Sequence, residues 1–150
     1  MVTFTDLAGP ETGYNDVVTL PYQLRQKSRL STKTDQGVEI GVILPRGQSM
    51  RAGCILIGTD DFKVLIKAAS EQVSVLRCED MLAFAKACYH LGNRHVALQI
   101  EQGPFGGGEF RYLQDHVLDH LVEGLGMMVT HEQLSFEPEN GAYHSHHAHE

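Results

Sequence analysis

The hydrophobic and polar positions in the first half of the chain alternate with a period of two, which is typical of β-strands. In VEIGVILPRG, every second residue from Val38 to Leu44 is apolar, and a Pro-Arg-Gly turn follows. Two more apolar runs, CILIG at 54–58 and KVLIKA at 63–68, flank the turn residues TDD. Strands at such short, even spacing predict a small antiparallel barrel or sandwich.

In the second half the period alternates between that of strands and that of helices. VSVLR at 73–77 predicts a strand, and Asp80 then suits the N-cap of a helix that ends at Gly92. The apolar residues of this helix recur at helical spacing, at Met81, Phe84, Ala85, Cys88 and Leu91.

The pattern then repeats with a second helix. HVALQI at 95–100 and EFRYL at 109–113 predict two strands joined by the flexible connection GPFGGG. Asp115 opens a helix before Gly126, and MMVTHEQL at 127–134 predicts the last strand. The apolar stripe of this helix consists of Leu118, Leu121, Val122 and Leu125. From Val73 the order is therefore βαββαβ, the ferredoxin-like arrangement.

These elements predict an α+β protein of two domains and a tail. We expect a small antiparallel β domain at 1–70 and a ferredoxin-like domain at 71–136. Residues 137–150 have almost nothing apolar to bury, so we expect a flexible tail in the absence of a ligand.

Composition excludes several classes of protein. The net charge of −7 opposes nucleic-acid binding, because cationic side chains supply most of the affinity for phosphate. The three cysteines are scattered and predict neither disulfides nor a thiolate zinc site. The sequence has neither a bilayer-length apolar run nor a secretory start, so we expect a cytoplasmic protein with no membrane association.

Histidine is the unusual residue, with nine copies gathered mainly at or after His95. Four of them fall in the last seven positions, at His144, His146, His147 and His149. A short His-rich tract is typical of transition-metal capture, because imidazole binds Zn, Ni, Cu and Fe. An expression tag and a passive polar end are the alternatives, although a tag is usually an unbroken run.

The segment DHVLDHLVE places a second group of candidate ligands on one helix. His116 and His120 lie one turn apart, with Asp119 and Glu123 beside them, opposite the leucine stripe. Two imidazoles at this spacing can hold one metal ion, and the alternative is the wetted face of an amphipathic helix.

Two further readings involve isolated histidines. His95 follows a helix in the loop LGNRHV, where a lone histidine is more often structural than a ligand. A mixed thiolate site from Cys88, His90 and His95 is disfavoured because Cys88 lies on the apolar stripe.

Enzyme signatures are missing from the sequence, which contains no H-E-x-x-H, no G-x-S-x-G and no phosphate-binding loop. The nearest to one is the cluster of Asp115, His116, Asp119 and His120, which would suit a metal-dependent hydrolase. A peptide-binding adaptor that uses no metal is a third class. We therefore expect that the protein is not an enzyme.

Three stretches resemble one known family, the urease accessory metallochaperones (UreE). They are GNRHVALQI, YLQDHVLDHLVEGLG and FEPENGAYHSHHAHE, and the upstream QKSRLSTKTDQGVEIGVILPRG and ILIGTDDFKVLIKAASEQVSVLR resemble the N-terminal domain of that family. The resemblance covers most of the chain. It implies nickel delivery during assembly of the urease active site.

The resemblance also implies the form of the metal site. It implies a homodimer whose two His95 side chains share one Ni²⁺ at the two-fold axis, with tail histidines completing the coordination sphere. Zn²⁺ or Cu²⁺ would compete, and metal could also link dimers into a tetramer. The implied partners are the urease accessory GTPase and the apo-urease complex.

One position departs from the family pattern. Some members carry His-Asp-His where this chain has Gln114, Asp115 and His116. An amide is a poor ligand for nickel, so His116 is expected to form only a weak auxiliary site.

Overall fold

The computed structural model describes residues 1–58 and 60–140, and the chain divides into two compact units, Met1–Ala69 and Ser70–Glu150. The tail histidines from His144 onward lie outside the described residues. No helix in the described ranges is long and apolar enough to cross a membrane.

Unit 1 is built on one six-stranded sheet with the order β2-β6-β5-β1-β4-β3. Its strands are β1 (Val2–Ala8), β2 (Asp16–Leu20), β3 (Arg29–Lys33), β4 (Glu39–Ile43), β5 (Ile55–Gly58) and β6 (Val64–Ala68), with a 3₁₀ turn at Pro10–Thr12 and the short helix α1 (Tyr22–Arg25). Asp35, just after β3, donates its backbone N–H to Val17 O in β2, so the two edges of the sheet meet at this point.

The predicted β character of unit 1 is confirmed, but its sheet is mixed rather than antiparallel. Strand β1 pairs with β4 in parallel, and β2 pairs with β6 in parallel. The spacing of apolar runs and turns along a sequence can predict pairing only between successive strands. These parallel partners lie more than 30 residues apart and are joined by long crossovers, which leave no local signal.

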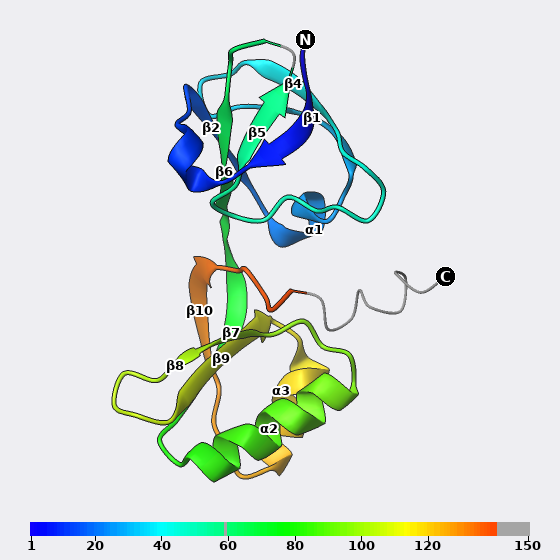
Figure 1. The fold of residues 1–150 in the computed structure, drawn as a ribbon. Helices are drawn as coiled ribbons and strands as arrows, with labels where there is room; N and C mark the ends of the chain where they lie inside the picture. Colours follow the sequence, from blue (N-terminus) through cyan, green and yellow to red (C-terminus); the bar gives the residue numbers. More distant parts are fainter. Residues whose placement is uncertain (59, 141–150) are drawn as a thin grey trace. The chain divides into compact units, whose positions relative to one another are not determined.

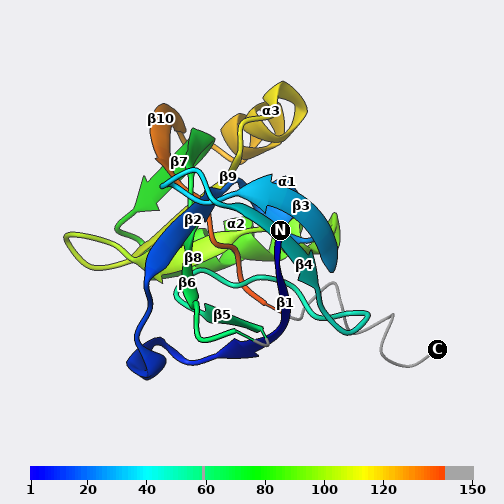
Figure 2. The same cartoon turned by 90° about the horizontal axis from the view of Figure 1, so that it is seen from above.

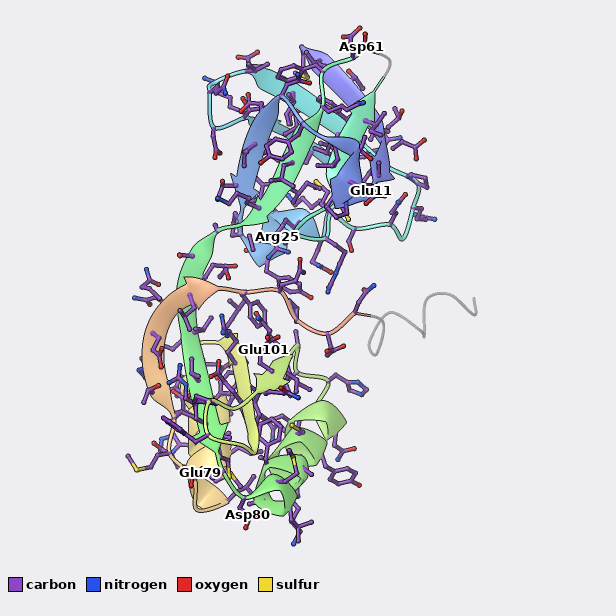
Figure 3. All side chains as sticks on the ribbon, turned by 60° about the vertical axis from the view of Figure 1, so that its left-hand side comes forward. Glu11, Arg25, Asp61, Glu79, Asp80 and Glu101 are labelled. Atoms are coloured by element: carbon purple, nitrogen blue, oxygen red, sulfur yellow. The ribbon has the colours of Figure 1, made fainter. Side chains whose placement is uncertain are left out.

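The core of unit 1 follows the predicted alternation. Ile40, Val42 and Leu44 are buried, and Val38 packs against them at the margin. One buried cation accompanies this core. Arg25, labelled in Figure 3, is fully buried. Its Nε donates to Leu20 O, and its guanidinium lies over the ring of Tyr22.

Unit 2 has the predicted βαββαβ order. Its elements are β7 (Ser70–Cys78), α2 (Met81–Asn93), β8 (Gln99–Gln102), β9 (Gly108–Leu113), α3 (His116–Gly124) and β10 (Thr130–Ser135). The sheet order is β10-β7-β9-β8, with every neighbour antiparallel. Both helices lie on one side of this sheet (Figures 1 and 2) and form a core with Leu76, Phe110 and Tyr112.

The start of one strand and the buried face of one helix in unit 2 differ from the predicted ones. Strand β8 begins at Gln99 rather than at residue 95, because the backbone turns sharply at His95. Met81 and Ala85, expected on the buried stripe of α2, are exposed, and Ala87 is buried instead.

The chain after β10 crosses the helix-free face of the sheet. We call residues 136–140 the strap. Arg111 Nη1 donates to Ser135 O at 2.8 Å, Gln99 Oε1 accepts from the Glu137 N–H at 2.8 Å, and the Glu139 N–H donates to Leu98 O at 2.7 Å. The segment predicted to be flexible from residue 137 is therefore bonded to the sheet as far as Glu139.

Candidate metal centre

Helix α2 positions the first candidate ligand by ending just before it. Asp80 caps the helix as predicted, since its Oδ1 accepts from the Leu82 and Ala83 N–H groups at 3.0 and 3.3 Å. Phe84, Ala87 and Leu91 anchor the helix in the core. The last turn therefore has a fixed place relative to the sheet.

The C-terminus of α2 is a Schellman motif with histidine at the left-handed position. The Val96 N–H donates to Leu91 O at 3.2 Å, and the His95 N–H donates to Gly92 O at 3.0 Å. His95 has φ 59°, and no other non-glycine among the described residues has a positive φ. Glycine or asparagine is usual here, and an ordinary L-residue costs roughly 1 kcal/mol.

This strained backbone holds His95 on an exposed turn. Val96, the next residue, packs into the core beside Leu91, so the turn is fixed on both sides. Backbone strain that the surroundings enforce is concentrated at functional sites. The sequence-based end point, Gly92, is inside the helix, so the left-handed position was not predicted.

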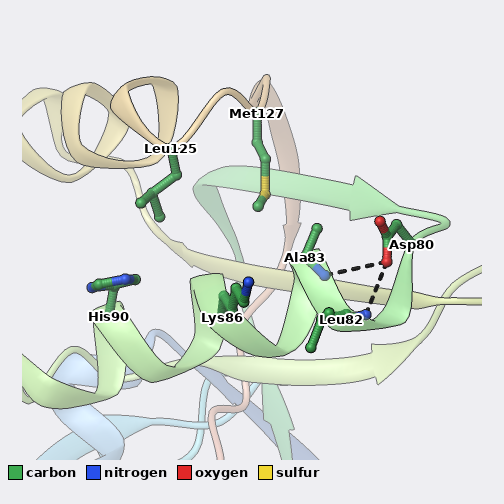
Figure 4. Close-up of a pocket in the computed structure, with 7 residues that line it drawn as sticks. All are labelled: Asp80, Leu82, Ala83, Lys86, His90, Leu125 and Met127. Atoms are coloured by element: carbon green, nitrogen blue, oxygen red, sulfur yellow. Dashed lines mark hydrogen bonds between the residues drawn. The ribbon is translucent and has the colours of Figure 1, made fainter.

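The other histidine of α2 belongs to a different surface. His90 lines a pocket of about 220 Å³ between α2 and the segment after α3 (Figure 4). The remaining lining residues are Asp80, Leu82, Ala83, Lys86, Leu125 and Met127. Cys88 is partly buried against the core, and burial raises the pKa of its thiol. The disfavoured Cys88, His90 and His95 site is not assembled in the described chain.

Helix α3 presents two exposed histidines. Its N-cap is Asp115, as predicted, and the carboxylate accepts from the Val117 and Leu118 N–H groups at 2.8 and 3.3 Å. His116 is the first helical residue, and His120 lies 4.0 Å from Glu123, measured from Nδ1 to Oε1. Both imidazoles are exposed to solvent.

Asp119 does not belong to this wet face, which corrects the sequence-based placement. Its side chain is buried against the sheet, where Oδ1 accepts from Ser74 Oγ at 2.7 Å and from Tyr112 OH at 2.6 Å. Oδ2 lies 2.8 Å from His131 Nε2. Asp119 is adjacent to the leucine stripe on the helical wheel. Its side chain points inward because the hydrogen-bond donors of Ser74, Tyr112 and His131 lie on that side.

The hydrogen bonds around Asp119 favour its ionised form although the side chain is buried. Burial alone would raise the pKa of Asp119, but the hydrogen bonds from Tyr112, Ser74 and His131 outweigh it and lower that pKa. Burial and the same carboxylate raise the pKa of Tyr112. An ionised Asp119 only accepts, so His131 Nε2 carries the proton. Sequence reasoning missed this network, whose members lie up to 57 positions apart.

The hydrolase cluster is therefore not assembled. Asp115 is used as a helix cap and Asp119 as a buried acceptor, which leaves His116 and His120 on the surface. Across residues 1–58 and 60–140, no three His, Cys, Asp or Glu side chains are grouped so that they could hold a metal ion.

Together these features define a two-unit α+β protein in which a ferredoxin-like unit presents a strained surface histidine. The sequence of that unit, residues 71–150, matches the family "UreE urease accessory protein, C-terminal domain", and residues 3–69 match the N-terminal domain of the same family. The chain belongs to the UreE urease accessory protein family, which is a family of accessory chaperones and not of enzymes.

Whole-length relatives agree with this assignment. A urease accessory protein UreE of Alkalilimnicola ehrlichii is 49% identical over 143 residues, covering 95% of this chain and 85% of that protein. One from Enterobacter sp. (strain 638) is 48% identical over 150 residues, covering 97% of this chain and 93% of that protein. A role in urease maturation follows from the family.

Proposed function

We propose that this chain is a nickel metallochaperone that delivers Ni²⁺ to apo-urease while the urease active site is assembled. Membership of the family supports the urease pathway, and the geometry around His95 supports the metal. The single observation that carries the proposal is a histidine held at positive φ on an exposed turn, where glycine would be the unstrained choice.

One imidazole is too few for a tight site, so a second copy of the chain is required. In a homodimer, two-fold symmetry doubles each ligand, and two His95 side chains share one ion. Tail histidines at 144, 146, 147 and 149 complete the coordination sphere. His116 serves as a weak auxiliary ligand on each subunit.

A carrier must hold its ion and also release it. A few imidazoles with open coordination positions suit this task, because no closed cage has to be dismantled. Imidazole binds in its neutral form, so nickel affinity falls as the pH drops through about 6.5. Zn²⁺ and Cu²⁺ compete for the same ligands.

The charge of unit 2 favours a cationic cargo. Residues 70–150 contain twelve of the nineteen acidic residues and only four of the twelve Lys and Arg. A negative surface raises the local concentration of a divalent ion. Release then follows docking to the urease accessory GTPase and the apo-urease complex in the cytoplasm, and metal could link dimers into a tetramer.

Equilibrium dialysis with Ni²⁺ tests the proposal. His95→Ala should abolish the tightest site, while the matched control His120→Ala, exposed on α3, should leave it intact. Truncation after Ala142 should lower the stoichiometry and leave one ion per dimer. Failure of the truncated protein to bind any nickel, or equal uptake at pH 5 and pH 8, would rule out the shared His95 site.

The two alternative functions make different predictions. A hydrolase would turn over an ester or phosphate substrate with Zn²⁺ or Mn²⁺ and lose that activity in His116→Ala, yet the carboxylates it needs are already engaged. A peptide-binding adaptor would bind its partner equally well in the presence of a chelator. Neither alternative accounts for His95 at positive φ.

A further inference from the structure

We infer that one face of helix α2 is a docking surface for an acidic amphipathic segment of a partner protein. The surface consists of three basic side chains, Lys86, His90 and Arg94, and of the apolar pocket beside them. We call the three residues the basic row. This surface goes beyond the proposed function, and its test needs no metal.

The first observation is the spacing of the basic row. Its members follow one another at intervals of four residues, from the middle of α2 to its C-cap, and all three are exposed. Side chains four residues apart share a helix face, so they form one line about 12 Å long. A cation near a helix C-terminus also favours the helix dipole, but that effect is confined to the last turn and does not account for Lys86.

The second observation is that the Lys and Arg of this row are not paired. Unit 2 contains four Lys and Arg in total. Arg77 and Arg111 form ion pairs with carboxylates of the sheet. Lys86 and Arg94 form no ion pair with any residue that the structure describes. The two cations that remain available to a partner therefore lie on one line.

The third observation is the charge around the row. No Asp or Glu occurs between Met81 and Asn93, and the carboxylate of Asp80 caps the opposite end of the helix. Exposed charges more than ~8 Å apart are largely screened at physiological salt. Acidic residues farther away than this weaken the positive potential of the row little, so the row complements an acidic partner although unit 2 as a whole is acidic.

The fourth observation is the pocket of about 220 Å³ that the row borders. Lys86 and His90 line it together with Leu82, Leu125 and Met127. Leu125 and Met127 point toward α2 from the segment after α3 (Figure 4). Pockets for small molecules usually measure ~300–1,000 Å³, so this one suits one or two apolar side chains of a partner.

These observations together define the occupant. It needs apolar side chains for the pocket and carboxylates for the basic row, on the same side of one segment, as in an amphipathic helix that lies in a groove. Nucleic acid and inorganic anions lack the apolar part. The row ends at Arg94, so the bound segment lies beside His95. Only the use of this position for metal hand-over rests on the proposed function.

A metal-free titration of the full chain tests the surface. The probe is a short helical peptide of Leu, Ala and Glu, whose Leu and Glu residues share one face, and binding is followed by fluorescence anisotropy. We expect saturable binding, and roughly tenfold weaker binding of a peptide that has Gln in place of every Glu. Amide NMR signals of residues 82–94 and 125–127 should shift during the titration. Absence of binding, or shifts confined to other residues, would overturn the inference.

A double variant tests the charge of the row. Lys86→Gln combined with Arg94→Gln removes both permanent cations, so the affinity for the acidic peptide should fall roughly tenfold. The matched control is Lys33→Gln combined with Lys67→Gln, which removes two exposed cations from unit 1 and should leave the affinity unchanged. Equal losses in the two double variants would show that only net charge matters and would contradict docking on the row.

A third variant tests the pocket. Leu82→Gln removes an apolar side chain that lines it, so both the acidic and the neutral peptide should bind roughly three- to tenfold more weakly. Met81→Gln is the matched control, because Met81 is similarly exposed on the same helix and does not line the pocket. Unchanged affinity in Leu82→Gln would remove the apolar part of the proposal.

Two other occupants are separated by the same material. If inorganic phosphate displaces the peptide and Leu82→Gln has no effect, the row binds small anions and the inference fails. If the variant with Lys86→Gln and Arg94→Gln differs in mass from the unsubstituted protein in light scattering, a second copy of the chain covers the row, and the inference also fails. None of these measurements uses nickel, so a failure here leaves the proposed function intact.

Discussion

The two units of this protein differ in how many polar and charged groups accompany their hydrophobic cores. Unit 1 is a curled sheet around an almost entirely apolar core, and its net charge is close to zero, with eight Lys and Arg against seven Asp and Glu. Unit 2 is strongly acidic and carries a buried carboxylate network, a strained histidine and the strap. The features on which the proposed nickel site depends are thus concentrated in unit 2, and unit 1 can be perturbed separately.

The largest expected effect is a loss of stability that is confined to unit 1. A Cβ at Gly58 would collide with the backbone carbonyl of Thr3, beside the irregular pairing of β1 and β5. Gly58→Ala should therefore destabilise unit 1 by about 3 kcal/mol, as overpacking against rigid backbone does. Urea unfolding measures this loss, and nickel dialysis should show unchanged affinity. A drop in nickel affinity would mean that unit 1 contributes to the site.

The next effect targets the polar core of unit 2. Asp119→Asn replaces a carboxylate that accepts from Ser74, Tyr112 and His131 with an amide that has one acceptor oxygen. We expect a loss of about 2–3 kcal/mol in the free energy of unfolding. Glu123→Gln, on the exposed side of the same helix, is the control and should change stability little. Chemical denaturation at pH 7 compares the two.

A smaller effect should be a gain in stability rather than a loss. His95 has φ 59°, so His95→Gly relieves strain that His95→Ala retains. We expect the glycine variant to be more stable than the alanine variant by about 1 kcal/mol, with both losing the tight nickel site. Thermal unfolding of the pair measures the difference. Equal stabilities would show that the turn relaxes in solution.

The smallest effect depends on pH. Hydrogen bonds from Arg77 and Thr130 lower the pKa of Glu132 to about 2. Because the folded pKa lies below the unfolded value of about 4.3, the stabilisation is present above that value and is lost as the pH falls toward 2. This partly exposed pair contributes at most about 1 kcal/mol. Glu132→Gln should flatten the acid side of the stability profile by that amount.

Much of the fold could be predicted because its signals are local. Alternation marked β4, β5 and β6, and helical spacing with Asp80 and Asp115 as caps marked α2 and α3. The parallel pairs of unit 1 could not be predicted, since strand pairing over long loops depends on the whole core. Glycine at position 92 suggested the usual helix stop, while the left-handed residue came three positions later.

The candidate site was less predictable for the same reason. His95 was named from the family resemblance, because a lone histidine carries no signal of its backbone angle. Asp119 was placed in solvent because its partner Ser74 comes from a strand 45 positions earlier. Tyr112 is only seven positions away, but it lies in β9, which a helical wheel of α3 does not include. The strap lacks any periodicity, and its hydrogen bonds to Gln99 and Leu98 emerge only once the sheet exists.

The left-handed turn at residue 95 restricts how the ligand chemistry proposed for this residue could be re-engineered. Besides glycine, asparagine and aspartate tolerate this backbone region best. Both would exchange a nitrogen donor for oxygen, which shifts preference from nickel and copper toward hard cations such as manganese or magnesium. Ion preference could thus be changed at this position without disturbing the helix terminus that carries it.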